Sequence, residues 1–165
     1  MEEVTALKRA CQKMGIKNMK ITFISVNKRH HMRFFADAKD GDRNGNIHPG
    51  TVVDSGVVHP FEYDFFLYSH AGLAGTSRPA HYHVLYDEIG FSSDQIQELS
   101  FRLCFLYCRA TKSVSIVPAA YYAHLVAARA KCHSSFGSDT ASNASSGQEV
   151  LSKVLKEIQD SMFFV

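Results

Sequence analysis

The order of the apolar segments constrains the fold of this chain more than any other sequence feature. The first half holds short runs rich in β-branched and aromatic residues, led by residues 20–26 (KITFISV). The second half holds longer segments in which apolar residues recur at helical spacing. With one helix predicted ahead of the strands, over residues 2–14 and ending at Gly15, this order predicts an α/β layer whose sheet is only partly contained here.

Further strands and helices are predicted along the rest of the chain. Strands are expected over 51–58, 61–68 and 81–86, after a Gly-, Pro- and Asp-rich loop at 37–50. Ser92 and Gln95 stand at capping-box spacing, and they predict a mostly buried helix that continues to Cys108 with a stripe of Ile96, Leu99, Leu103 and Leu106. Pro118 suits the first turn of the next helix, which is expected to run to about residue 133.

The C-terminal region differs in composition from the rest. Residues 134–147 contain six Ser, and they predict a flexible linker. An amphipathic helix and an apolar tail are expected over 148–165. The whole chain, 1–165, is therefore expected to form one partial domain with a linker before its last helix.

Composition excludes several classes of protein. A chain that is 45% hydrophobic and 21% charged can bury a core, which argues against disorder. No apolar run approaches the length of a membrane span, so no membrane partner is expected. Four Cys at irregular spacing do not form a disulfide framework, and this favours the cytoplasm, with the nucleus as the alternative. The net charge of +2 identifies no partner by itself.

The distribution of charge is more informative than its sum. Lys28, Arg29, His30, His31 and Arg33 place five potentially cationic groups within six residues, directly after the first strand. They are either a solvated strand end or a contact to phosphates, since a sheet can hold strand-end cations against a nucleic-acid backbone.

Two other pairs of residues have plainer interpretations. His81 and His83 share one strand face, but two ligands of one type are too few to specify a metal site, so a packed, hydrogen-bonded pair is favoured. Cys104 and Cys108 lie one helical turn apart and are interpreted as small core residues.

A second polar region runs from Arg109 to Leu125, where cations, hydroxyls and aromatic residues alternate up to a predicted helix N-terminus, which favours anions. On that helix His124 and Arg129 point about 140° apart and should serve different sites. A single His on a helix is most often a core residue and less often a functional one. The spacing alone leaves both interpretations of His124 open.

Several long motifs resemble the C-terminal part of the Piwi domain of eukaryotic Argonaute proteins. They are KRHH, HPGTVVD, SHAGLAGTSRP and YYAHLVA, in this order, with a terminal MFFV. The resemblance covers nearly the whole chain except the Ser-rich stretch. It implies the C-terminal half of a ribonuclease-H-like fold and a role in RNA-mediated gene silencing. The implied partners are a small guide RNA, its complementary target RNA and the remainder of an Argonaute chain.

The resemblance also implies roles for individual residues. The implied contacts to guide phosphates are Lys28, Arg29, His31, Arg33, His70, Arg78, Arg109, Ser115 and Tyr121. Arg129 and the carboxylate of Val165 are implied to approach the pocket for the guide 5′-phosphate. His124 matches the His that completes the metal-binding catalytic set of cleaving members.

The catalytic carboxylates of the family have no counterpart in this sequence. RNA cleavage with Mg²⁺ as the cofactor is therefore expected of an intact parent Argonaute protein. This chain alone is expected to bind no cofactor and to cleave nothing. Two alternatives remain: a catalytically inactive RNA-binding or regulatory module, and the remnant of a truncated gene.

Overall fold

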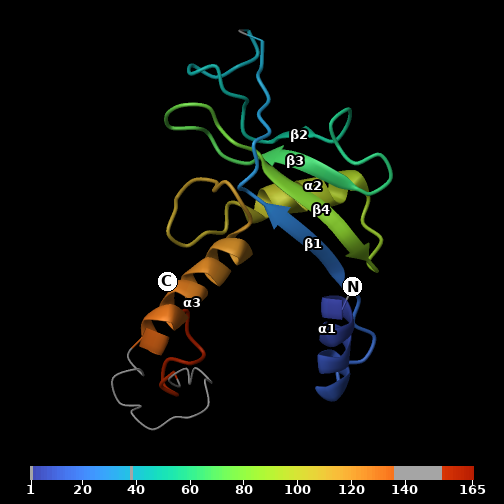
Figure 1. The fold of residues 1–165 in the computed structure, drawn as a ribbon, viewed down its shortest axis with the longest axis vertical. Coiled ribbons are helices and arrows are strands. Elements are labelled where there is room, and N and C mark those ends of the chain that lie inside the picture. Colours follow the sequence, from blue (N-terminus) through green and yellow to red (C-terminus); the bar gives the residue numbers. More distant parts are fainter. Residues whose placement is uncertain (1, 38, 136–153) are drawn as a thin grey trace. The chain divides into compact units, whose positions relative to one another are not determined.

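A computed structural model describes residues 2–37, 39–135 and 154–165 of the chain. These residues form two compact units, Met1–Val117 and Pro118–Val165. The first unit holds a sheet, two helices and the loops around them, and the second holds one long helix and the C-terminal residues (Figure 1).

The first unit is built around a four-stranded antiparallel sheet with the order β1-β4-β3-β2. The strands are β1 Thr22–Asn27, β2 Thr51–Val53, β3 Asp64–Tyr68 and β4 Ala80–Asp87. All four predicted strands are present, but β2 and β3 are shorter than expected. Gly56 adopts a positive φ of 75°, and the His59 backbone N–H donates to Asp64 Oδ1 at 2.7 Å, so the chain turns through residues 54–63 instead of extending.

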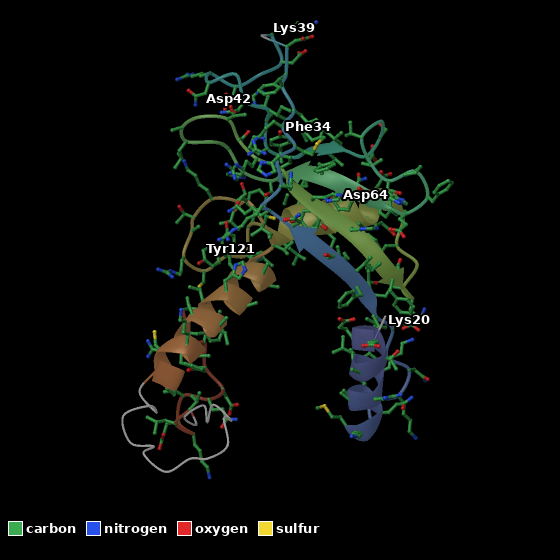
Figure 2. The ribbon with its side chains drawn as sticks, in the orientation of Figure 1. Lys20, Phe34, Lys39, Asp42, Asp64 and Tyr121 are labelled. Atoms are coloured by element: carbon green, nitrogen blue, oxygen red, sulfur yellow. The ribbon has the colours of Figure 1, made fainter. Side chains whose placement is uncertain are left out.

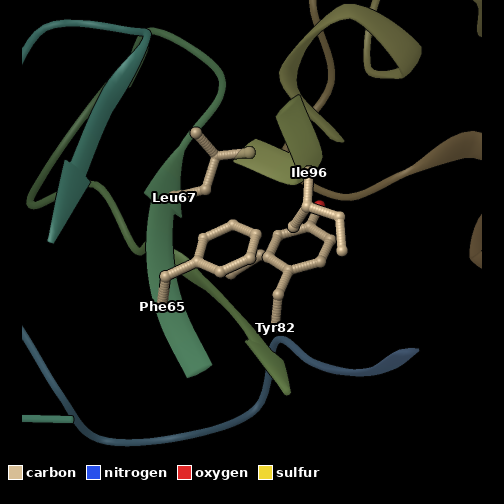
Figure 3. Packing of buried hydrophobic residues seen from close by; sticks show 5 residues of the cluster. Phe65, Leu67, Tyr82 and Ile96 are labelled. Carbon is tan, nitrogen blue, oxygen red and sulfur yellow. The ribbon is translucent and has the colours of Figure 1, made fainter. Parts of the chain in front are cut away.

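The core lies between one face of this sheet and helix α2, Ser93–Leu103. Period-two alternation points Phe65 and Leu67 of β3 toward α2, where they meet Tyr82 of β4 and Ile96 of the helix (Figure 3). The rings of Phe65 and Tyr82 stack with centroids 5.2 Å apart. Phe65 and Leu67 are completely buried, so this contact is the main apolar contribution to the fold.

Helix α2 begins as predicted and ends early. Gln95 N–H donates to Ser92 Oγ at 3.2 Å, and the Ser92 N–H donates to Gln95 Oε1 at 2.9 Å, which completes the capping box. The prediction that the helix continues to Cys108 is wrong, because the chain leaves it in tight turns and returns with Val114 N–H bonded to Cys104 O at 2.9 Å. Cys104 is buried as expected, whereas Cys108 is exposed.

The predicted burial of α2 is also wrong. Ile96 is 1% exposed, but Leu99, Leu103 and Leu106 are 41%, 37% and 66% exposed. The apolar stripe of the sequence is therefore wider than the contact that the sheet makes with the helix.

Helix α1, Glu2–Lys13, precedes β1, and Gly15 terminates it in the turn that follows, as predicted. Gly15, with φ of 74°, donates to Gln12 O, and Ile16 N–H donates to Cys11 O, both at 3.0 Å, in a Schellman arrangement. Lys8 Nζ donates to Glu88 Oε1 at 2.5 Å, so the helix is tied to the residue after β4. Hydrogen bonds from Lys8, Tyr86 and the Ile21 N–H lower the pKa of Glu88 to about 2.

The second unit contains α3, Pro118–Ser135, which begins at the predicted proline. The predicted linker at 134–147 falls, from residue 136 onward, outside the described residues, as do residues 148–153 of the predicted last helix. From residue 154 the chain forms successive turns with bonds such as Ser161 N–H to Ile158 O at 3.0 Å, and no helix is assigned there. In the described part of the chain, no helix is long and apolar enough to cross a membrane.

Candidate nucleic-acid interface

The basic segment, residues 28–33, follows β1 and crosses the sheet face opposite α2. Asn27 is the last residue of β1 and pairs with His81 near the start of β4, so the segment emerges beside the loop that precedes β4. The side chains of Arg29 and His31 are exposed, and those of Lys28, His30 and Arg33 are half-buried. The segment thus alternates between residues that face the protein and residues that face solvent.

Aromatic contacts hold this segment on the sheet. His30 and Phe34 each pack edge-on against Phe66 of β3, with ring centroids 5.4 and 5.3 Å apart. The Phe34 N–H donates to the Tyr68 hydroxyl at 3.1 Å, and that hydroxyl lies 3.4 Å from Phe34 O, to which it donates. Figure 2 shows Phe34 beside the sheet and Lys39 at the distant tip of the following loop. The segment therefore has a fixed path and is not a free strand end.

The structure brings further cations to the same edge of the sheet. Burial lowers the pKa of His30. The hydrogen bond to Pro79 O raises this pKa, and the charges of His81, Arg33 and Arg78 lower it further. Burial also lowers the pKa of His70, with an added contribution from Lys28. Lys28 is thus within electrostatic range of the half-buried His70, and Arg33 and Arg78 are within range of the half-buried His30, although Arg78 is about fifty residues away along the chain.

The loop that carries Arg78 is braced by a buried asparagine. Asn46 is 4% exposed, its Nδ2 donates to Gly75 O at 3.0 Å, and its Oδ1 accepts from Ser77 N–H at 2.8 Å. Gly72 passes so close that a Cβ there would lie 3.1 Å from Asn46 Nδ2. The loop at 37–50, confirmed as a loop in its described residues, thus supports the path of residues 70–79.

The remaining predicted contacts lie elsewhere. Arg109 is exposed in the loop after α2, whereas Ser115 is only 7% exposed. Ser69 Oγ donates to Val114 O at 2.6 Å and fixes this loop beside the end of β3. Tyr121, His124, Arg129 and Val165 belong to the second unit, where Tyr121 is half-buried and the others are exposed. Their roles stay predictions.

His81 and His83 form the packed pair that was favoured over a metal site. His81 Nε2 lies 2.6 Å from Asp64 Oδ2, and His83 Nε2 lies 2.7 Å from Glu62 Oε2. Burial opposes ionisation of Asp64, but the hydrogen bonds from His81 and the His59 N–H outweigh it and lower the pKa of that carboxyl. His81 thus bonds to a carboxylate on the neighbouring strand β3, and His83 lies within ion-pair distance of Glu62, which precedes that strand.

The described residues do not fit a Mg²⁺ site. They contain no group of three or more His, Cys, Asp or Glu placed to hold a metal ion. Mg²⁺ prefers a set of oxygen ligands, and the single exposed imidazole of His124 does not provide one. We therefore derive no metal-dependent step for this chain.

The half-buried His30 and His70 should make the fold sensitive to mild acid. His30 and His70 have pKa values lowered from 6.5, so the unfolded chain binds more protons than the folded one as the pH falls below that value. Stability is therefore expected to decrease between about pH 7 and pH 5, whereas the contribution of Asp64 is lost only at lower pH, because its pKa lies below 3.8.

Urea midpoints measured across this range test the prediction. The double variant His30→Gln/His70→Gln should show a flatter dependence on pH than the unmodified chain, because glutamine does not titrate. Equal pH dependence of the two proteins would contradict it.

The features that hold the basic segment could not be assigned from the sequence. In the sequence, His30 is one of the potentially cationic groups. The sequence did not predict that Phe34, Tyr68 or Asn46 would contribute to the site. The alternation of Lys28 and His30 with Arg29 and His31 was a signal for an inward and an outward face, but the partner face became apparent only once the strands were paired.

The fold and this basic edge define a class of protein. The chain superimposes on the C-terminal lobe of a budding yeast Argonaute with a TM-score of 0.89 and 32% identity, over 99% of this chain and 36% of that one. An Argonaute from Kluyveromyces polysporus with a guide RNA matches with the same TM-score and identity, and 21% of its chain is covered. The chain thus has the ribonuclease-H-like α/β fold of a Piwi-domain lobe, as its motifs predicted.

Sequence comparison identifies the family. The Piwi domain matches residues 1–135. Protein argonaute 1D of Oryza sativa subsp. japonica is 52% identical over 153 residues, which is 90% of this chain and 15% of that protein. Protein argonaute 5 of Arabidopsis thaliana is 47% identical over 98% of this chain and 17% of its own length. This chain belongs to the Argonaute/Piwi family, and it spans about a sixth of the length of these curated relatives.

Proposed function

We propose that this chain binds the backbone phosphates of a small guide RNA as part of an Argonaute protein in RNA-mediated gene silencing. The observation that carries the proposal is the hydrogen bond of His30 Nε2 to Pro79 O, which brings the segment of Lys28 and Arg33 beside Arg78, together with the exposed Arg29 and His31. A structurally similar Argonaute contains a guide RNA, which supports this assignment. Pairing of the guide with a complementary target RNA is part of the same proposal.

The chemistry of this edge favours phosphates over bases. Lysine and arginine side chains neutralise phosphate charge and carry no sequence information when they contact only the backbone. Arg33 Nη1 donates to His30 O at 3.2 Å and to Met32 O at 2.6 Å. These bonds orient the guanidinium and leave its other donors for a ligand. The interface should therefore bind RNA in a manner that depends strongly on salt and weakly on sequence.

Salt-dependent binding of single-stranded RNA by the 165-residue chain tests the proposal. For single strands, each neutralised phosphate contributes about −0.7 to the slope of log affinity against log salt, so three to five contacts predict about −2 to −3.5. Fluorescence anisotropy with two RNAs of unrelated sequence and equal length measures this slope. A flat salt dependence, or a strong preference for one sequence, would contradict the proposal.

The role of His124 is proposed only for a larger Argonaute protein. There it would complete a Mg²⁺-binding catalytic set with carboxylates from outside this chain, and Arg129 and the Val165 carboxylate would approach the guide 5′-phosphate. We propose the cytoplasm as the place of action.

A regulatory RNA-binding module without catalysis is the second candidate, since the cations of the first unit lie together without any contribution from His124. Measurable RNA cleavage by this chain would exclude that candidate.

A further inference from the structure

We propose that His30 is a positioning residue for phosphate binding, which fixes the basic segment and the loop of Arg78 relative to each other without contacting the RNA. The inference rests on the proposed function and adds to it a specific device. Lysine and arginine side chains from two separate segments can bind one phosphate chain well only if their spacing is set before the RNA arrives.

One hydrogen bond joins these two segments directly. His30 Nε2 lies 2.9 Å from Pro79 O, and because a carbonyl can only accept, the imidazole donates. Pro79 is fully buried and follows Arg78, so its carbonyl is a rigid anchor one residue from an exposed guanidinium. The bond therefore fixes the distance between the basic segment and the loop of Arg78.

Ring contacts fix the orientation of the same imidazole. It packs edge-on against Phe66 of β3 at 5.4 Å and against His81 of β4 at 6.3 Å. Its other nitrogen, Nδ1, is buried and has no hydrogen-bond partner among the described residues. With His30 directed into the sheet face, its neighbours Arg29 and His31 are directed to solvent, as their exposure shows.

Burial lowers the pKa of His30 below its usual 6.5, so the neutral imidazole predominates at neutral pH. The groups that face it are His81 on β4, Arg33 on its own segment and Arg78 on the loop, and their charges add to the effect of burial in lowering its pKa. Since a neutral, inward-facing side chain neutralises no phosphate, its removal should not change the salt dependence of binding directly. Any change in that slope must come from cations that have lost their positions.

Three substitutions at residue 30 separate the donor from the ring. His30→Gln keeps an amide N–H at about the distance of Nε2 from the backbone but removes the ring. His30→Phe keeps a ring of similar size and removes the donor, and His30→Leu removes both. His31→Leu is the comparison, because it removes one exposed candidate contact. It should lower the magnitude of the slope of log affinity against log salt by at most about 0.7.

Salt slopes of RNA binding by these variants test the inference. His30→Phe and His30→Leu are expected to lower the magnitude of the slope by about 1.4, equivalent to two phosphate contacts, and His30→Gln should restore at least half of that loss. Each measurement is made below the unfolding transition of the variant, followed by circular dichroism. If His30→Leu does not fold, the comparison of His30→Phe with His30→Gln is sufficient.

The possible failures are distinguishable. A flat salt dependence of the unmodified chain contradicts the proposed function, and this inference with it. A steep slope in the unmodified chain that is unchanged in His30→Phe contradicts only the role of His30. A slope in His30→Gln as low as that in His30→Phe also overturns the inference, because the bond to Pro79 would then not be the element that positions the cations.

Discussion

Replacing Lys28, Arg29 and Arg78 together by alanine should weaken binding of single-stranded RNA about 100-fold at low salt, because three charged contacts of about 1 kcal/mol each are lost. The slope of log affinity against log salt should fall in magnitude by about 2 in the same variant. Arg29 and Arg78 are exposed, and none of the three side chains belongs to the core, so the fold should be retained. Fluorescence anisotropy over a salt series measures both quantities.

A second triple variant separates local charge from net charge. The basic segment follows β1, whereas Lys13, Lys17 and Lys20 are exposed and precede it: Lys13 is the last residue of α1, and Lys20 lies just before the start of β1. Figure 2 shows Lys20 at that end of the sheet, beside α1. Replacing Lys13, Lys17 and Lys20 together by alanine removes the same net charge and should change the affinity for RNA less than threefold. An equal loss of affinity in the two variants would show that the chain attracts RNA only through its overall charge.

Replacing Phe65 by alanine is expected to lower the free energy of unfolding by about 3–5 kcal/mol. Phe65 is 0% exposed and stacks on Tyr82, so the substitution leaves a cavity between β3 and α2. The opposite face of β3 carries Phe66 and Tyr68, which support the basic segment, so RNA binding should be lost with the fold. The urea midpoint, followed by circular dichroism, measures this effect.

Phe61 provides the matched control for this substitution. It is 93% exposed and precedes β3, so Phe61→Ala should change the free energy of unfolding by only about 0.5 kcal/mol. If the two substitutions had similar effects, the contact between β3 and α2 would not be the principal core of the first unit.

Local sequence signals predicted the positions at which the elements begin and end. Gly15 ends α1, Ser92 and Gln95 cap α2, and Pro118 begins α3, because each acts through backbone geometry or hydrogen bonds within a few residues. The motifs likewise identified the family, because KRHH and SHAGLAGTSRP are long and specific. These features need no knowledge of distant contacts.

Burial was predicted less well, because periodicity does not reveal how much partner surface a face will meet. The stripe on α2 predicted a mostly buried helix, yet the sheet covers Ile96 and leaves Leu99 and Leu103 more than a third exposed. The strand predicted over 51–58 ends at Val53 because residues 54–63 turn to bring the His59 N–H to Asp64. In both cases a contact with another element decided the outcome.

The sequence by itself determined the class of fold, the family and the presence of a cationic segment after the first strand, because patterning and motifs are properties of neighbouring residues. Only the tertiary structure showed that Arg78 joins this segment and that His30 faces inward among cations. The antiparallel pairing of β1 with β4 brings Asn27 beside His81, and so places the segment next to Pro79. Strand pairing joins residues far apart in the chain, and the burial that follows from it lowers the pKa of His30.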